Sequence, residues 1–189
     1  MAKGEYGSFG EKIFNNWSID DLSDIQSTFD NIRYGIDWGF YPDPFRFLAT
    51  NIDEKRKKIY IYDELNLIEK TNIETMKYVK EKLHNPKAKI IADSAEPKSI
   101  QEYKNNQINI EGAKNGADSV QYGIKKMQEY QIIIDKSCTA TIKDFTYYSR
   151  KKDRNGNTTN VPEDSWNDST DMIRYILEEF TTKSAFWFV

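Results

Sequence analysis

Hydrophobic positions in the first third of the chain occur in short runs rather than at helical spacing. Three segments between residues 34 and 65 are apolar or alternate in polarity, and short polar turns separate them. This pattern is typical of strands joined as an antiparallel meander. The expected strands are 34–40 (YGIDWGF), 45–51 (FRFLATN) and 59–65 (IYIYDEL).

From residue 71 onward, helical spacing alternates with short apolar runs. Ile73, Met76 and Val79 share one helical face, and Thr71 followed by Glu74 matches a capping box at the start of that helix. Alternating helices and strands after a meander predict an α/β fold, with a mixed sheet flanked by helices. The expected elements are helix 71–83, strand 89–92, helix 97–103, strand 108–111, helix 119–130, strand 131–135, helix 138–148 and helix 168–180.

Residues 149–163 contain the strongest turn signal of the chain. The dipeptide Asn155-Gly156 is typical of a tight hairpin turn, because both residue types readily adopt positive φ. We therefore expect a basic β-hairpin or a mobile loop in this segment. Its cations are Arg150, Lys151, Lys152 and Arg154.

The N-terminal residues show no clear periodicity. Residues 1–30 are mixed and polar, and only residues 18–22 (SIDDL) indicate the start of a short helix. We expect residues 1–30 to form an N-terminal extension or a linker. The whole chain of 189 residues has the length of one ordinary domain.

The composition supports a folded domain and narrows its chemistry. Hydrophobic residues make up 38% of the chain and aromatic residues 14%, which supplies enough apolar area for a packed core. No apolar run approaches the length of a membrane span, and the N-terminus lacks the apolar stretch of a signal peptide. Because the net charge is −3, nucleic-acid binding would depend on local basic patches.

The single cysteine and the single histidine exclude several kinds of site. Cys138 has no partner for an internal disulfide, which fits a reducing cytoplasm. His84 lies in a polar segment, and one exposed histidine cannot build a zinc site. A metal site in this chain would therefore depend on carboxylates.

Four aspartates fall at positions where they could converge. Asp37 lies inside the first expected strand, where a carboxylate is unfavourable unless something requires it. Asp93 follows a buried strand, at the edge where α/β sheets usually carry their sites. Asp168 and Asp171 are three residues apart at the start of the last helix and share one face. Hard oxygen ligands of this kind suit Mg²⁺ or Mn²⁺.

Each of these acids also has a purely structural interpretation. Asp171 could be an N-terminal helix charge, Asp168 an N-cap and Asp93 the cap of a turn. Asp37 is the hardest to explain in this way. The chain holds 30 acidic residues, so four at suggestive positions do not by themselves establish a metal site.

The segments that carry these acids resemble a known family. They are similar to the C-terminal nuclease domain of tailed-phage large terminase subunits, in particular the PBSX-like group, over about residues 5–179. The resemblance implies an RNase H-like fold, with three antiparallel strands followed by parallel ones. The segments are YGIDWGFYPDP (34–44), IIADSAEPKSI (90–100), GADSVQYGI (116–124) and DSWNDSTDMIRY (164–175).

The resemblance also implies an endonuclease that cuts concatemeric viral DNA during head packaging, with two Mg²⁺ or Mn²⁺ ions. By position, Asp37, Asp93 and Asp171 match the metal-binding acids of the family, and Asp43 matches a further, secondary position. Asp168 departs from the family, which often has a histidine there. Asp168 could bind a metal as an anionic ligand but could not act as a neutral imidazole.

Local basic patches are the candidate DNA contacts. The cations of the expected hairpin would touch phosphates, and Lys114 and Lys136 are further candidates near the edge of the site. Such contacts supply affinity without sequence choice. No groove-reading helix motif is evident, so little sequence preference is expected.

The sequence leaves the wider context open. It contains no Gly-x-x-x-x-Gly-Lys-Ser/Thr loop, so we expect no ATPase domain within these residues. The family implies a small terminase subunit, a portal and the subunit's own ATPase domain as partners, in the cytoplasm of a bacterial host and away from membranes. Two alternatives are another RNase H-like nuclease, such as a junction resolvase or repair enzyme, and an inactive interaction domain of a prophage remnant.

Overall fold

The computed structural model describes residues 11–114 and 119–185, with side chains described as far as residue 179. Seven strands form one sheet in the order β1-β7-β4-β3-β2-β5-β6. Only β3 runs antiparallel to its neighbours, and every other pairing is parallel. The strands are β1 (Trp17–Asp20), β2 (Ile32–Asp37), β3 (Phe45–Asp53), β4 (Lys58–Leu67), β5 (Ile90–Ala92), β6 (Ile110–Gly112) and β7 (Gln131–Asp135).

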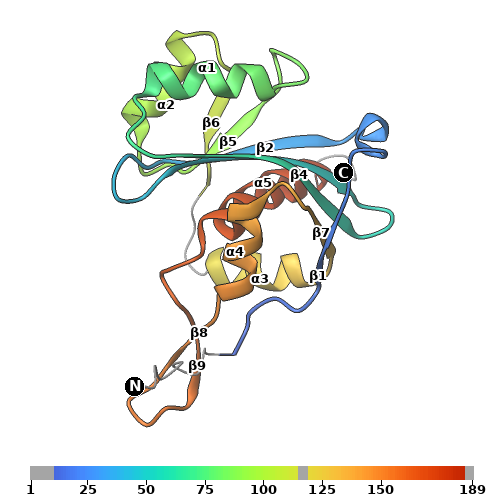
Figure 1. The fold of residues 1–189 in the computed structure, drawn as a ribbon, viewed down its shortest axis with the longest axis vertical. Coiled ribbons are helices and arrows are strands. Elements are labelled where there is room, and N and C mark those ends of the chain that lie inside the picture. Colours follow the sequence, from blue (N-terminus) through green and yellow to red (C-terminus); the bar gives the residue numbers. More distant parts are fainter. Residues whose placement is uncertain (1–10, 115–118, 186–189) are drawn as a thin grey trace, which may run out of the picture.

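Helices cover both faces of this sheet (Figure 1). Two helices, α1 (Asn72–Lys82) and α2 (Pro97–Asn105), lie on one face. Three lie on the other, namely α3 (Ser119–Gln128), α4 (Thr139–Tyr147) and α5 (Asp168–Ala185). The expected mixed sheet flanked by helices is confirmed. No helix in the described part of the chain is long and apolar enough to cross a membrane.

Alternation along the strands divides the core into two layers. Tyr34 and Ile36 of β2 pack in the cluster that includes α1 and α2. Leu48 of β3 packs in the other cluster, with α3, α4 and α5. Since side chains alternate between the two faces of a strand, Gly35 and Asp37 face α5. The period-2 pattern of β2 therefore places its carboxylate on the α5 side.

The expected helix start at residues 18–22 is wrong. Trp17–Asp20 forms the edge strand β1, which pairs in parallel with β7. Three of its four residues are exposed, and its four residues (WSID) are too short a run for their alternation to mark a strand in the sequence. Before it, Ile13 and Phe14 are buried in the α5-side core. Residues 1–10, also within the predicted extension, lie outside the described residues.

The expected basic hairpin is present. β8 (Arg150–Lys152) pairs antiparallel with β9 (Thr158–Pro162) in a separate two-stranded sheet. In the turn, Gly156 has φ +83°, and a carboxylate oxygen of Asp153 accepts hydrogen bonds from the backbone N–H groups of Asn155 and Asn157 at 2.8 and 2.9 Å. The hairpin projects from the body of the domain on the side of α3 and α4 (Figure 1).

Candidate metal centre

Asp37 is the last residue of β2 and is largely buried under the first turn of α5. Burial raises the pKa of Asp37 to about 7, and the neighbouring carboxylates of Asp168, Asp93 and Asp171 add to this effect. Because the three other carboxylates all contribute to the pKa of Asp37, the four predicted acids lie near one another. Carboxylates that repel one another are a poor arrangement unless a cation is to bind among them.

Asp93 reaches this point because β5 runs parallel to β2 at its side. The backbone N–H of Asp93 donates to the carbonyl of Ile36 at 3.0 Å, which continues the ladder past the end of β5. Trp38 Nε1 donates to the Asp93 carbonyl, also at 3.0 Å. The carboxyl ends of two adjacent parallel strands therefore set Asp37 and Asp93 side by side, as the strand-edge argument predicted.

The acids of α5 reach the cluster because α5 lies very close to β2. A Cβ atom at Gly35 would lie 3.0 Å from Met172 Cβ and 3.1 Å from Ile176 Cδ1. Only glycine permits this approach without a shift of the helix. The first turn of α5, with Asp168 and Asp171, is thereby brought over the end of β2.

Asp171 is held by two neighbours. Arg174 Nη2 lies 3.2 Å from Asp171 Oδ1, and Asn167 Nδ2 donates to Asp171 Oδ2 at 3.0 Å. Burial raises the pKa of Asp171, and Arg174 opposes this rise. Arg174 passes directly over Gly123 of α3, where a Cβ would fall 2.2 Å from Arg174 Cγ.

A buried arginine holds Asp168, and sequence reasoning did not find it. Arg46 of β3 is 3% exposed and is the register partner of Asp37 on β2. Its Nη1 lies 3.3 Å from Asp168 Oδ2, and its Nη2 lies 3.0 Å from Asp144 Oδ2. Nη2 also donates to Ser169 Oγ at 2.7 Å. Burial raises the pKa of Asp168, and the Arg46 charge opposes this.

The four carboxylates lie near one another, but their side chains do not point to a common metal position. Within residues 11–114 and 119–185, no group of three His, Cys, Asp or Glu side chains is placed to hold a metal ion. The contacts explain why: Asp168 turns to Arg46, Asp171 to Arg174, and Asp93 accepts from the N–H of Ala95 at 3.2 Å. The donor set is all-oxygen and strongly anionic, which fits a divalent cation such as Mg²⁺ or Mn²⁺.

Asp43 and the sole histidine lie differently with respect to this cluster. Asp43, in the turn before β3, is near enough to Asp168 to contribute to the raised pKa of Asp168. His84 bonds through Nδ1 to the hydroxyl of Tyr34 at 2.7 Å. Because Tyr34 packs in the core on the α1 side, His84 serves the opposite face of the sheet from Asp37.

The predicted DNA-contacting cations are in varied surroundings. Lys151 pairs with Asp164 and Lys136 with Asp21, each at 2.5 Å, and Arg150 Nη1 donates to the Asn160 carbonyl at 3.0 Å. Lys136 follows β7, three strands from β2 in the sheet order. Lys152 and Arg154, on the hairpin, are exposed.

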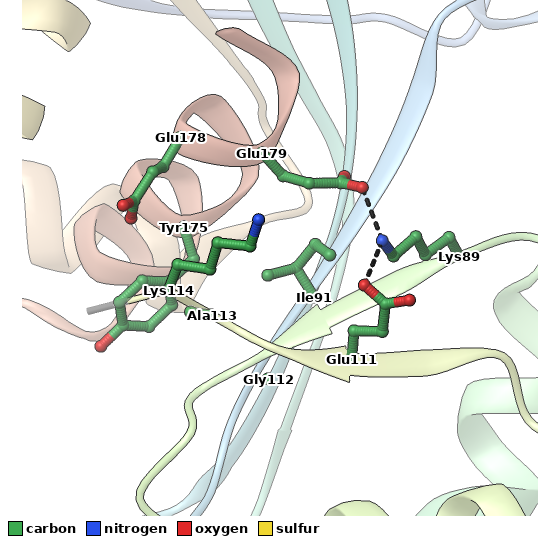
Figure 2. A pocket seen from close by; sticks show the side chains of 9 residues that line it. All are labelled: Lys89, Ile91, Glu111, Gly112, Ala113, Lys114, Tyr175, Glu178 and Glu179. Carbon is green, nitrogen blue, oxygen red and sulfur yellow. Dashed lines mark hydrogen bonds and ion pairs between the residues drawn. The ribbon is translucent and has the colours of Figure 1, made fainter. Parts of the chain in front are cut away.

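Lys114 lies in a cavity whose Tyr175 is near three of the four acids. This cavity, of about 320 Å³, is between the β5–β6 edge and α5, and Lys114 lies beside Tyr175 in it (Figure 2). The pKa of Tyr175 is raised by burial, with contributions from Asp171, Asp93 and Asp37. The cavity with Lys114 therefore adjoins the acid cluster on the β5 side.

Comparison with known proteins identifies the family. The model of the terminase RNase H-like domain matches residues 37–179. The chain belongs to this family. The matched region begins at Asp37 and includes Asp93, Asp168 and Asp171, so all four clustered acids lie within the family domain.

Individual relatives agree with this assignment. The large terminase subunit of Bacillus phage SPP1 is 37% identical over 189 residues, covering 96% of the chain and 44% of that protein. The PBSX phage terminase large subunit of Bacillus subtilis (strain 168) is 27% identical over 160 residues, covering 82% of the chain and 37% of that protein. The chain thus spans less than half the length of both.

The fold matches a solved structure of the same kind. The crystal structure of the SPP1 large terminase nuclease domain with bound Mn superimposes with a TM-score of 0.81. The two are 34% identical, and the match covers 88% of this chain and 98% of that one. The predicted RNase H-like fold and the resemblance to large terminase nuclease domains are both confirmed.

Proposed function

We propose that this chain is a metal-dependent endonuclease domain that cuts double-stranded viral DNA concatemers during phage genome packaging, with little sequence preference. The observation that carries the proposal is the convergence of Asp37, Asp93, Asp168 and Asp171 at one edge of the sheet. The similarity to the Mn-bound SPP1 nuclease domain supports it from a separate direction.

In the proposed mechanism the acids divide into two ligand pairs. Asp37 and Asp171 would hold one ion, and Asp37 and Asp93 would share the second. Bound there, two Mg²⁺ or Mn²⁺ ions would activate a water and neutralise the leaving 3′ oxygen of the phosphodiester. Asp37 must lose its proton to serve both pairs. Without a metal its raised pKa keeps that proton until about pH 7, and a bound cation would favour its release.

Asp168 has a different role from the three other acids. Arg46, which Asp168 shares with Asp144, offsets part of the charge of Asp168, and this helps the cluster to tolerate a fourth carboxylate where the family often has a neutral imidazole. Asp168 is then a secondary ligand, and Asp43 stays further out beside it. Arg150, Lys151, Lys152 and Arg154, with Lys114 and Lys136, are the proposed phosphate contacts.

The wider context of the reaction is proposed from the relatives. As part of a large terminase subunit, the domain would work in the cytoplasm of the bacterial host, away from membranes. Its partners would be double-stranded DNA, the ATPase domain of the same subunit, the small terminase subunit and the portal.

The test is plasmid cleavage with matched variants. Supercoiled plasmid is incubated with the chain in Mn²⁺ or Mg²⁺, beside Asp37→Asn, Asp171→Asn and the control Asp24→Asn, an exposed acid before η1 (Gln26–Thr28). We expect loss of about a hundredfold or more in rate for the two cluster variants, and none for the control.

Three outcomes would contradict the proposal. Equal cutting by Asp37→Asn and the wild type would remove the site assignment. No cutting by the wild type with either metal would favour an inactive interaction domain. A strong preference for four-way junctions over linear duplex would instead indicate a resolvase.

A further inference from the structure

A groove of about 270 Å³ lies beside the acid cluster, on the side away from the Lys114 cavity. It is bounded by the start of β3, the end of β4, the first turn of α4 and the start of α5. Arg46 and Asp168 form the wall that it shares with the acid cluster. The other lining residues include Asn66, Lys143, Asp144 and Trp166.

The strand register places this groove at a defined distance from Asp37. Asp37 pairs with Arg46, and Arg46 pairs with Asn66 on the next strand. Register partners in antiparallel strands project from the same face, so the three side chains form a row across the sheet. Adjacent strands are about 4.8 Å apart, so Asn66 lies about 10 Å from Asp37. One DNA strand rises about 3.4 Å per nucleotide along the duplex axis and follows a longer path around it, so 10 Å corresponds to at most about three nucleotides.

The charges of the groove leave one cation available. Arg46 pairs with both acids of the groove lining, the buried Asp144 and Asp168, and Ser169 Oγ donates to Asp144 at 2.5 Å. Lys143 is exposed, and no ion pair to it is found in the described residues, in contrast to Lys136 and Lys151. Arg46 Nε is buried and has no hydrogen-bond acceptor among the described residues.

The helix end at the groove is not itself an anion site. Glu64 of β4 accepts hydrogen bonds from the backbone N–H groups of Ala140 and Thr141, both at 2.9 Å. The first turn of α4 is therefore already capped by a carboxylate. An anion entering the groove would have to bind through side chains. The exposed ones that can donate a hydrogen bond are Lys143, Asn66 and Thr139, with the indole N–H of Trp166.

We propose that this groove binds a backbone phosphate of the duplex within about three nucleotides of the cut. Lys143 is the cationic contact, and the Asn66 amide donates a hydrogen bond. Trp166, which is 46% exposed and lies with its ring 5.1 Å from that of Tyr147, forms the outer wall beside the bound strand. This inference rests on the proposed nuclease function, because it takes Asp37 as the point of cleavage.

Duplex binding without turnover tests the groove directly. A fluorescent 30-base-pair duplex is titrated with the chain in EDTA at several KCl concentrations, using Lys143→Gln, Lys143→Arg and Lys80→Gln. Lys80 is exposed on α1, which covers the opposite face of the sheet. For Lys143→Gln we expect weaker binding, and a salt slope smaller by about one than that of the wild type. Lys143→Arg and Lys80→Gln should keep the wild-type slope.

Tryptophan fluorescence gives a second readout at the same place. Binding of an unlabelled duplex should change the emission of the wild type, and Trp166→Phe should lose most of that change. A salt slope for Lys143→Gln equal to that of Lys80→Gln would overturn the inference, as would no duplex binding by the wild type. Failure of the nuclease proposal is seen separately, as absence of Mn²⁺-dependent plasmid cutting.

Discussion

At the scale of single residues, the surroundings of Asp37 favour the protonated form of its carboxyl group. Its pKa rises from 3.8 to about 7, chiefly through burial. The unfolded chain releases this proton near pH 4, whereas the folded chain keeps it until about pH 7. Folding stability from this group is therefore highest at low pH, and is lost as the pH rises from about 4 to about 7.

The Asp37→Asn variant should remove the loss of folding stability that accompanies the rise in pH. Without metal, we expect it to be more stable than the wild type by about 2 kcal/mol at pH 8 and to be nearly equal at pH 4.5. The full difference in pKa corresponds to at most about 4 kcal/mol, and partial solvent exposure reduces it. Urea unfolding in EDTA at the two pH values measures the gap, with Asp24→Asn as control. A gap that does not grow with pH would contradict the raised pKa.

The residues of the site differ in how far the sequence could reveal them. Local pattern singles out Asp37, Asp93 and Asp171 as candidates, because they stand in a strand interior, at a strand edge and at a helix start. The resemblance to the terminase family is what marks them as metal-binding acids. Arg46 could not be predicted as a site residue, because in the sequence it is only one polar position of an alternating strand. Its partner Asp144 is 98 residues away along the chain, and only the strand register and the packing of α4 bring the two together.

At the scale of elements, strands with a strong local pattern were predicted, and the strand that depends on a distant partner was missed. The meander strands have strong apolar patterns and were predicted. β1 has three exposed residues out of four and depends on pairing with β7, whose sequence begins 111 residues after its own last residue. Local pattern carries no information on such a pairing, since an edge strand needs only backbone partners.

The contact between α5 and β2 determines where the helix acids lie. Gly35→Ala would place a Cβ within 3.0 Å of Met172 Cβ, an atom next to the backbone of α5 that cannot turn aside. We expect α5 to be displaced, with a loss of roughly 1–3 kcal/mol in unfolding free energy. The displacement should also slow DNA cutting by about tenfold or more, because it moves Asp171 from Asp37.

A control variant separates the effect on stability from the effect on cutting. Ala49→Gly, on the same sheet but on its α1-side core, should cost stability without moving α5. Urea unfolding and Mn²⁺-dependent plasmid cutting are measured for both variants at a temperature where both are folded. Cutting by Gly35→Ala at the wild-type rate would show that the close approach of α5 is not needed to place Asp171.

At the scale of the whole molecule, one edge of the sheet concentrates negative charge while the two cores on its faces supply stability. The strands β2 and β5 end there together, and α5 begins there, so three elements contribute acids to one point. In the absence of a cation this edge opposes folding through burial of carboxylates and their mutual repulsion. Divalent metal binding should therefore raise the stability of the entire domain, not only activate its chemistry.

The size of this effect follows from mass action. At a free Mn²⁺ concentration of about one hundred times Kd, the stabilisation is about 2.7 kcal/mol, which for a domain of this length raises Tm by roughly 5–10 °C. Calorimetry at pH 8 with and without Mn²⁺ measures the shift, and excess EDTA should reverse it. NaCl at matched ionic strength should not reproduce it. Asp37→Asn should begin with a higher metal-free Tm and gain little from Mn²⁺, because the substitution removes both the unfavourable burial and the shared ligand. An equal gain in Asp37→Asn and the wild type would mean that the cation stabilises the domain elsewhere.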